Sequence, residues 1–391
     1  MRGFDAELPG PAMSRRATRI YNANRFKLGL FAPNCSGGLT MTKAPERWEA
    51  SWDNNVKAAQ LSDEAGLEFI LPVGRWHGYR GETDTEGTSF ETLTWASGLL
   101  ASTRELCVFG TLHVAFINPV FAAKQIVTAD HIGKGRFGLN IVSGWNAGEF
   151  DMFGITLKEH ERRYAYTEEW LNIVKRIWKE ATPFDADGEN FQLKAVEGKP
   201  KPWFDDYPVL ISAANSADGR AFAVRHADCL FTTVIQPDKL AEEIKVIRAT
   251  PGAKSHDAGI FGSGHMICRP TRKEAEEYYH YIVYEMGDWE AAEHTAIIRT
   301  KGRNTPLAAL KSLKERLISG LGTFPIIGSY DDAAETFKWM SDAGLTGMAI
   351  GLVNYIKDFP ALRDEVLPRM ERLGLRKRRQ AAPAQPRSAA H

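Results

Sequence analysis

The sequence has few cysteines and no cluster of closely spaced metal ligands. Its four cysteines, Cys35, Cys107, Cys229 and Cys268, stand far apart, without a CxxC pair or paired histidines at ligand spacing. We therefore expect neither a disulfide framework nor a metal site. The four side chains are predicted to be reduced and mostly buried thiols.

An excess of charge and long apolar runs are also absent. Lysine plus arginine equals aspartate plus glutamate, 49 each, so no overall field draws the protein to nucleic acid or anionic lipid. The apolar runs fall short of the roughly 18 residues that a membrane-spanning helix needs. Arg15, Arg16 and Arg19 are followed by no apolar segment, so neither a secretory nor a twin-arginine signal is complete. These absences favour a cytoplasmic protein that binds a small molecule.

The segment HIGKGRFGLNIVSGWNAGEFDMFG contains the spacing G-x-G-x-x-G in Gly133, Gly135 and Gly138. In a dinucleotide-binding fold such glycines follow a strand and open a helix, because the pyrophosphate meets the free N–H groups of that helix. Here Asn118-Pro119 predicts a helix start, and Gly133 ends the apolar periodicity that follows. The next run, FGLNIV, predicts a buried parallel strand, so a dinucleotide site is not expected.

Short β-rich runs alternate with longer amphipathic runs, which is typical of βα units around a parallel sheet. The expected strands are 27–32, 69–72, 106–110, 136–142, 208–212, 228–232, 259–266 and 347–352. The expected helices are 48–65, 88–101, 161–179, 217–225, 238–249, 273–286, 331–342 and 359–372. Eight strands alternating with helices predict an α/β fold of the (β/α)8 TIM-barrel type, and the alternative is a doubly wound open sheet.

The barrel is expected to span residues 25–374, with two insertions. The insertion at about 181–207 predicts a small hairpin, because alternating residues are bounded by glycine and proline. The insertion at about 289–325 is expected to form a lid, with a mobile loop over 295–303 and a helix over 307–321. Residues 1–24 and 375–391 lack core-forming residues and are predicted to be disordered.

Polar side chains stand where the predicted strands end, which is where a TIM barrel carries its active site. Asn140 interrupts an apolar strand, so burying its amide without a hydrogen-bond partner costs about 1 to 3 kcal/mol. Thr111 also needs a partner, but its hydroxyl can bond a neighbouring carbonyl at little cost. Ser216 is suited to cap a helix whose N–H groups hold a phosphate, although a plain cap is equally consistent. Arg163 opposes a helix dipole and suits an anion, or else it is solvated.

The histidines form no nucleophilic triad that spacing alone reveals, and Glu149 with Asp151 is either a carboxylate pair or an exposed loop. Aromatic residues gather near the strand ends and suit a flat ring system. These residues are Trp76, Tyr79, Phe116, Trp145, Phe150 and Phe153. Together with the anion site they predict a cofactor with a flat ring and one phosphate.

Four stretches resemble the bacterial-luciferase-like flavin monooxygenases: DHIGKGRFGLNIVSGWNAGEF, ERRYAYTEEWLNIVKRIW, ISAANSADGRAFAVRHAD and IIGSYDDAAETFKWMSDAGLTGMAI. The resemblance runs from about residue 27 to about residue 373 and is most marked for the pyrimidine, dimethylsulfone and alkanesulfonate monooxygenase branch. It implies a TIM barrel that binds reduced FMN (FMNH2) from a separate NAD(P)H:flavin reductase. With O2 as co-substrate, such an enzyme inserts one oxygen atom into a small molecule.

The same resemblance assigns roles to residues. It implies that the flavin contacts Gly74, Arg75, Asn140, Glu149, Arg163, Tyr164 and Ser216. It also implies an O2 pocket at the flavin N5 edge, which permits an N5-peroxide in place of a C4a-peroxide, formed by Leu71, Thr111 and Asn140. His77, His113 or Arg75 would orient the substrate or supply a proton. The further expected substrate contacts are Trp76, Phe116 and Trp145.

The resulting hypothesis is a two-component flavin-dependent monooxygenase acting on a heteroaromatic or organosulfur compound. One alternative is a deazaflavin-dependent oxidoreductase of the same fold. The others are a non-catalytic flavin-binding protein and a barrel hydrolase, which would need a metal cluster at the strand ends. The exposed helices of the expected fold favour a homodimer or homotetramer.

Overall fold

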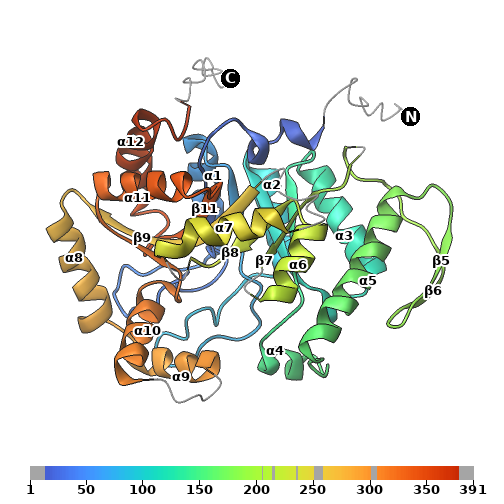
Figure 1. The fold of residues 1–391 in the computed structure, drawn as a ribbon, viewed down its shortest axis with the longest axis horizontal. Helices are drawn as coiled ribbons and strands as arrows, with labels where there is room; N and C mark the ends of the chain where they lie inside the picture. Colours follow the sequence, from blue (N-terminus) through green and yellow to red (C-terminus); the bar gives the residue numbers. More distant parts are fainter. Residues whose placement is uncertain are drawn as a thin grey trace, which may run out of the picture.

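Eight parallel strands close into a barrel in the computed structural model, which describes residues 14–204, 206–213, 216–234, 237–250, 259–300 and 306–377 (Figure 1). The barrel strands are β1 (Lys27–Phe31), β2 (Phe69–Leu71), β3 (Cys107–His113), β4 (Phe137–Val142), β7 (Val209–Ala213), β8 (Cys229–Thr232), β9 (Gly259–Arg269) and β11 (Gly347–Gly351). The sheet is closed because β9 pairs with β11 on one side and with β8, the last strand of the order, on the other. The predicted TIM barrel is confirmed, and the open sheet is wrong.

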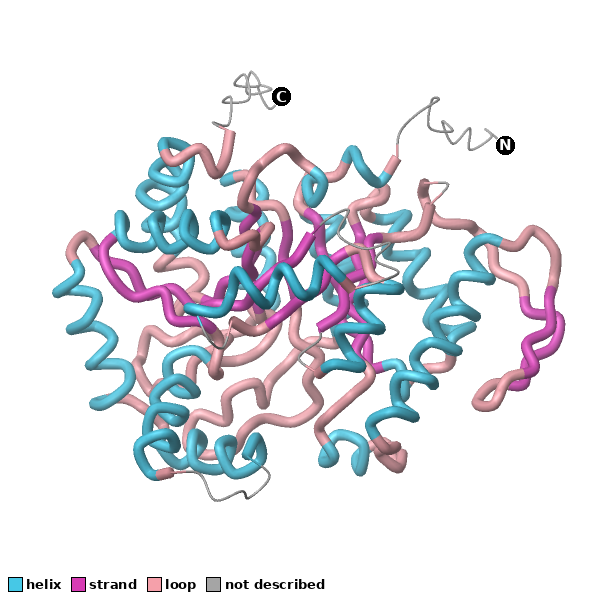
Figure 2. Tube along the Cα trace, viewed as in Figure 1, coloured by secondary structure: helices cyan, strands magenta, loops and turns pink. Residues whose placement is uncertain are grey.

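Helices surround the strands, as the cyan and magenta segments of Figure 2 show. They are α1 (Trp52–Ala65), α2 (Thr92–Ser102), α3 (Pro119–Ile132), α4 (Ala147–Met152), α5 (His160–Lys179), α6 (Ala217–His226), α7 (Leu240–Ala249), α8 (Arg272–His280), α9 (Trp289–Thr300), α10 (Leu307–Gly320), α11 (Tyr330–Asp342) and α12 (Leu367–Arg372). The start of α2 differs from the predicted residue 88, because the Glu91 carboxylate caps the N–H groups of Leu93 and Thr94. The two ends of the described chain lie at the top of Figure 1, opposite α4, α9 and α10.

The glycine-rich segment takes the predicted form. Helix α3 begins after Asn118, whose side chain caps it, and ends at Gly133, before the buried strand β4. Gly138 is required by close packing, since a Cβ there would lie 2.3 Å from the Phe109 ring. The glycines therefore end a helix and pack a strand, as expected. The four cysteines are buried and free, also as predicted.

The first insertion has the predicted structure, whereas the second contains a strand that was not predicted. The first forms the expected hairpin, β5 (Phe184–Asp187) and β6 (Gln192–Val196), which projects at the right of Figure 1. The second contains the predicted helix α10 but also an unpredicted strand, β10 (Phe324–Ser329). This strand pairs with the part of β9 that extends past the end of β8, from Gly264 onward.

The predicted mobile loop at 295–303 is wrong as far as Thr300, because α9 continues to that residue. Its buried alanines pack in one cluster with the apolar face of α10, and this tertiary packing outweighs the local composition. Residues 301–305 lie outside the described residues.

The chain ends are more ordered than predicted. Residues 14–24 contain two short 3-10 helices, Arg15–Ala17 and Arg19–Tyr21, and Ile20 closes the interior of the barrel against strand residues that include Phe69 and Val209. Leu375 and Arg376 are also buried. The predicted disorder is therefore wrong for 14–24 and 375–377, and residues 1–13 and 378–391 lie outside the described residues.

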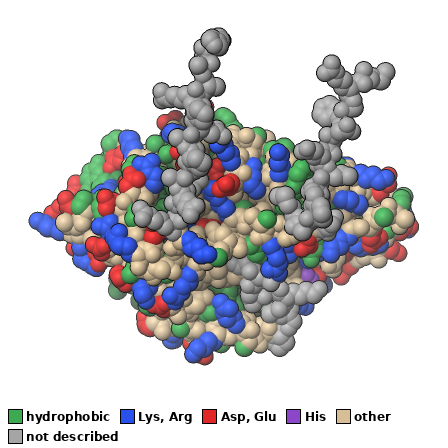
Figure 3. Space-filling view, turned by 90° about the horizontal axis from the view of Figure 1, so that it is seen from above, with side chains coloured by type: hydrophobic (Ala, Val, Ile, Leu, Met, Phe, Trp, Pro, Cys, Tyr) green, Lys and Arg blue, Asp and Glu red, His purple; other side chains and the backbone are tan. Residues whose placement is uncertain are grey.

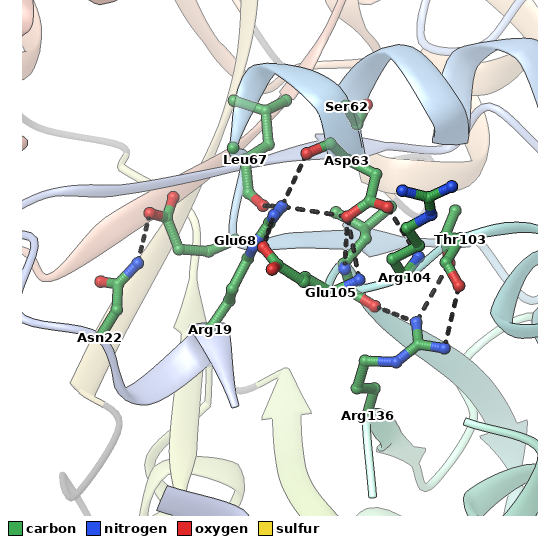
Figure 4. Close-up of polar contacts among 12 residues, drawn as sticks. Arg19, Asn22, Ser62, Asp63, Leu67, Glu68, Thr103, Arg104, Glu105 and Arg136 are labelled. Atoms are coloured by element: carbon green, nitrogen blue, oxygen red, sulfur yellow. Dashed lines mark hydrogen bonds and ion pairs between the residues drawn. The ribbon is translucent and has the colours of Figure 1, made fainter. Parts of the chain in front are cut away.

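Ion pairs explain this order at the amino end of the barrel (Figure 4). The Arg19 guanidinium pairs with Asp63 and Glu105, while Asp63 accepts hydrogen bonds from the N–H groups of residues 104–106. Buried Glu68 accepts bonds from Asn22 and Arg376, at 2.8 and 2.7 Å, and from the Leu28 N–H. Such long-range pairs leave no periodic pattern in the sequence.

We expect Arg376→Met to lower the free energy of unfolding by about 3 kcal/mol, because it removes the guanidinium that pairs with the buried Glu68 carboxylate at 2.7 Å. Urea denaturation measures the effect. Arg363→Met is the matched control, since it breaks an exposed pair with Asp364 and should cost under about 1 kcal/mol. Equal losses in the two variants would contradict the buried-pair account.

Basic and acidic side chains are interspersed on the face shown in Figure 3, in keeping with equal numbers of the two charges. Within the described ranges, no helix has both the length and the apolar character to cross a bilayer. The same part of the chain contains no group of three or more His, Cys, Asp or Glu residues arranged to hold a metal ion.

Candidate functional site

Asn140 and Thr111 face each other across β3 and β4 at the carboxyl end of the barrel. The Thr111 hydroxyl donates to the carbonyl of Pro72 at 2.7 Å and accepts from Asn140 Nδ2 at 3.1 Å. Because the Asn140 amide nitrogen is engaged in this way, its oxygen is directed elsewhere as an acceptor. Asn140 Oδ1 is buried and has no hydrogen-bond partner among the described residues. A ligand N–H is the natural partner for such an atom.

Leu71 lies on the neighbouring strand and belongs to the apolar interior of the barrel with Phe109 and Ile211. The structure thus places Leu71, Thr111 and Asn140 on three adjacent strands, β2, β3 and β4. By the strand register, Leu71 follows Ile70, the partner of Val108, and so lies below the level of Thr111 and Asn140 in the barrel. Strand β3 runs to His113 rather than to the predicted residue 110, so Thr111 and His113 are strand residues.

Arg75 is buried and surrounded by protein acceptors. Its Nε donates to Glu86 at 2.6 Å, Nη1 to Glu149 at 3.2 Å and Nη2 to the Tyr79 hydroxyl at 2.9 Å. Burial alone would lower the pKa of Arg75, but Tyr79, Glu86 and Glu149 together raise the pKa above its ordinary value. Arg75 therefore stays charged and is not suited to supply a proton. It organises the loop after β2 instead.

Glu149 connects this loop to α4. Its Oε1 accepts the backbone N–H of Trp76 at 3.0 Å, and Oε2 lies 3.9 Å from His113 Nε2. Burial, followed by the Arg75 charge, lowers the pKa of His113 to about 4, so this imidazole is neutral at pH 7. Gly74 permits the close approach, because a Cβ there would lie 2.9 Å from the His113 ring.

Aromatic side chains form a wall beside this network. Phe116 stacks on Phe153 with ring centroids 4.2 Å apart, and Trp76 meets Phe153 edge-on at 4.8 Å. Trp76 and Trp145 are 42% and 45% exposed, so they present ring surface to solvent rather than to the core. His77 contacts the carbonyl of Gly78 through Nδ1 at 3.0 Å. The predicted substrate residues thus lie around one rim.

The N-terminus of α6 lies beside the predicted phosphate residues. Ser216 caps this helix by accepting the N–H of Gly219 at 3.1 Å. A Cβ on Gly219 would lie 2.5 Å from the Tyr164 hydroxyl, so Tyr164 reaches the first turn of α6. Arg163 donates to the Gly144 carbonyl, while its buried Nε has no partner in the described part of the chain. The N–H groups of a helix N-terminus, a hydroxyl and a guanidinium are suitable ligands for a phosphate.

A small cavity of about 60 Å³ adjoins Arg163. It is lined by Ala115, Ser143, Phe150, Ile155, Thr156, Lys158, Arg163 and Tyr166. Two of these residues belong to the predicted site: Arg163, and Phe150, whose ring packs against Phe116 of the aromatic wall at 4.8 Å. The aromatic residues and Arg163 thus lie beside this cavity, while Ser216 and Tyr164 lie at the N-terminus of α6.

The sequence reasoning missed two polar residues near this end, Glu86 and His265, and it named Tyr79 only as part of the aromatic group, without its contact to Arg75. Glu86 and Tyr79 lie in a loop without periodicity, so no local pattern indicated their contact with Arg75. His265 is on β9, where a histidine among small and apolar residues was the available signal. The Thr323 hydroxyl donates to Gly320, so it accepts from His265 Nδ1 at 3.0 Å, which leaves Nε2 as a buried acceptor without a partner in the described ranges.

Known proteins share this architecture. A dimethylsulfone monooxygenase from Pseudomonas fluorescens, named as FMNH2-dependent, is 29% identical, with 89% of this chain and 95% of that protein covered. The pyrimidine monooxygenase RutA of Allorhizobium ampelinum is 25% identical, covering 84% of this chain and 92% of the relative. The crystal structure of DmoA from Hyphomicrobium sulfonivorans has a TM-score of 0.78 at 16% identity, covering 90% of this chain and 89% of the other. A sequence profile described as luciferase-like monooxygenase matches residues 26–347, so the chain belongs to that family.

Proposed function

We propose that this protein is a two-component flavin-dependent monooxygenase. It takes FMNH2 from a separate NAD(P)H:flavin reductase and uses O2 to oxygenate a small organic substrate. The observation that supports this proposal most directly is the buried Asn140 oxygen, which has no partner among the described residues. A helix N-terminus with Ser216 and Tyr164 supports it further. A planar ring with N–H donors and a phosphate tail fits this combination. The names of the similar enzymes support the same assignment.

The residues divide into those for the phosphate and those for the ring. Ser216, Tyr164 and the N–H groups of α6 would hold the phosphate with Arg163, since anions are stabilised at helix N-termini. Asn140 would accept from the ring, with Thr111 fixing its orientation. Reduced flavin supplies the electrons that activate O2 when it is bound.

The remaining residues of the rim exclude water and position substrate. Leu71 and the aromatic wall provide apolar surface, which protects a reactive oxygen species from solvent. Glu149 and Arg75 fix the backbone at Trp76, and the exposed Trp76 and Trp145 rings would offer flat surface to a substrate. Neutral His113 is suited to a hydrogen bond with substrate.

The substrate class that suits these rings is a heteroaromatic or organosulfur compound. Flat rings stack on Trp76 and Phe116, and polarisable sulfur makes favourable contacts with aromatic edges. We further propose a cytoplasmic homodimer or homotetramer.

Oxygen labelling tests this function. The protein is incubated with FMN, a flavin reductase, NADH and heteroaromatic and organosulfur substrates under ¹⁸O2, and products are examined by mass spectrometry. One labelled oxygen atom in a product is expected. Turnover with reduced deazaflavin but not FMNH2 would contradict the proposal, as would unlabelled products throughout the panel with peroxide release alone.

A further inference from the structure

Helix α9 of the second insertion is attached directly to the loop that follows β2. Asp288 caps α9 by accepting the Ala291 N–H at 3.0 Å and also accepts the Thr83 N–H at 2.6 Å. Gly81, with φ of +69°, permits this contact, because a Cβ there would lie 2.7 Å from the Asp288 carboxylate. The insertion and the Arg75 loop therefore pack as one unit.

Arg299, in the last turn of α9, reaches the same buried network from the other side. It donates to the carbonyl of Leu321 at 2.8 Å. Its guanidinium also lies close enough to Tyr79 for its charge to lower the pKa of that phenol, against the larger effect of burial, which raises it. Tyr79 is buried and also accepts from Arg75 at 2.9 Å. One guanidinium from the loop after β2 and one from the insertion thus act on the same phenol group.

The charges explain why two cations are needed. Arg75 contacts both Glu86 and Glu149, which are each only 1% exposed, so one guanidinium faces two buried carboxylates. Arg299 supplies a second positive charge to this cluster. Burial raises the pKa of Glu86, whereas the charges of Arg75 and then Arg299 lower it.

The other titratable groups around Glu86 are Cys35, Tyr79 and Tyr355. Burial raises the pKa of each above its ordinary value, so all three stay neutral near pH 7. They cannot replace Arg299 as a counter-charge.

We propose that Arg299 is a positioning residue that makes α9 part of the active site. Together with Arg75 and Tyr79, it neutralises the Glu86 and Glu149 carboxylates. This keeps Glu149 hydrogen-bonded to the Trp76 N–H and so fixes the backbone of the site at that residue. The effect on turnover rests on the proposed monooxygenase function. The charge balance among Arg75, Arg299 and the two glutamates does not depend on that function, since all of these groups belong to the protein.

Thermal unfolding of the full-length protein without cofactor, between pH 5.5 and 8.5, tests this role. A carboxyl group whose folded pKa is raised costs stability while it is ionised, and this cost disappears as the pH falls through that pKa. Arg299→Gln removes a counter-charge, so its Tm should lie about 4 °C below wild type at pH 8.5. The deficit should shrink to about 1 °C at pH 5.5.

Two further variants make the result specific. Arg299→Lys keeps the charge and should retain most of the stability at high pH. If the glutamine variant does not fold, the comparison is made between Arg299→Lys and wild type. Lys314→Gln is the matched control, because it breaks an ion pair between α10 and Glu293 of α9 at 2.6 Å without touching Tyr79. Its smaller deficit should not vary with pH.

A deficit for Arg299→Gln that is constant across this pH range would overturn the proposal. So would equal deficits at pH 8.5 for the lysine and glutamine variants. In an active preparation, Arg299→Gln should also lower kcat/KM about tenfold at pH 8. Because the Tm series needs neither flavin nor substrate, it stays decisive even if ¹⁸O2 labelling contradicts the monooxygenase function.

Discussion

Asn140→Leu is expected to reduce coupled oxygenation by about 10²- to 10³-fold while leaving the protein as stable as wild type or more stable. The Asn140 oxygen is buried without a partner among the described residues, so the folded protein carries its desolvation cost. Leucine has a similar shape and removes this cost. The same change removes the acceptor proposed for the flavin ring, so activity and stability should change in opposite directions.

Steady-state turnover with a flavin reductase and urea denaturation measure the two effects. Asn55→Leu is the matched control, because Asn55 is also buried but fully engaged with the Trp95 indole and the Ser51 carbonyl. That substitution should lower the free energy of unfolding by about 2 kcal/mol or more. A destabilised Asn140→Leu protein with full coupled activity would refute the role assigned to Asn140.

Glu149→Leu is expected to lower kcat/KM about 100-fold and the free energy of unfolding by about 3 kcal/mol. Glu149 is a buried anion that contacts Arg75 and the Trp76 N–H, so leucine removes a charge and a backbone anchor together. Glu149→Gln keeps an oxygen for the Trp76 N–H and should lose only about tenfold.

Kinetics with the heteroaromatic and organosulfur panel, together with urea denaturation, separate these effects. Asp151→Leu is the matched control, since Asp151 is on the same short helix but exposed. It should change kcat/KM by less than about twofold. Equal activity of the Glu149→Leu and Glu149→Gln proteins would show that the anchor at Trp76 has no part in catalysis.

The barrel was predictable because each of its strands has a recognisable local sequence pattern. A buried parallel strand is an unbroken apolar run, so FGLNIV and its counterparts could be located one by one. Asn140 was identifiable for the same reason, as a polar residue within such a run. Ser216 was identifiable as a helix cap, which is a local signal as well.

The contacts that assemble the rim were not predictable, because they join distant residues. The Arg75 pair with Glu149 spans 74 positions, and nothing near either residue indicates the other. Strand β10 was missed because it is an edge strand that begins with Phe324-Pro325. It pairs only with the part of β9 that extends beyond the end of β8. The order of residues 14–24 likewise depends on Arg19 reaching Asp63.

The central claim is that the carboxyl rim of this barrel binds reduced FMN. Anaerobic titration of the protein with FMNH2, followed by flavin absorbance, tests it most directly. The account predicts saturation at one flavin per chain, with a Kd raised about tenfold or more by Ser216→Ala and by Asn140→Leu. Absence of saturable binding, or an identical Kd in wild type and both variants, would contradict it.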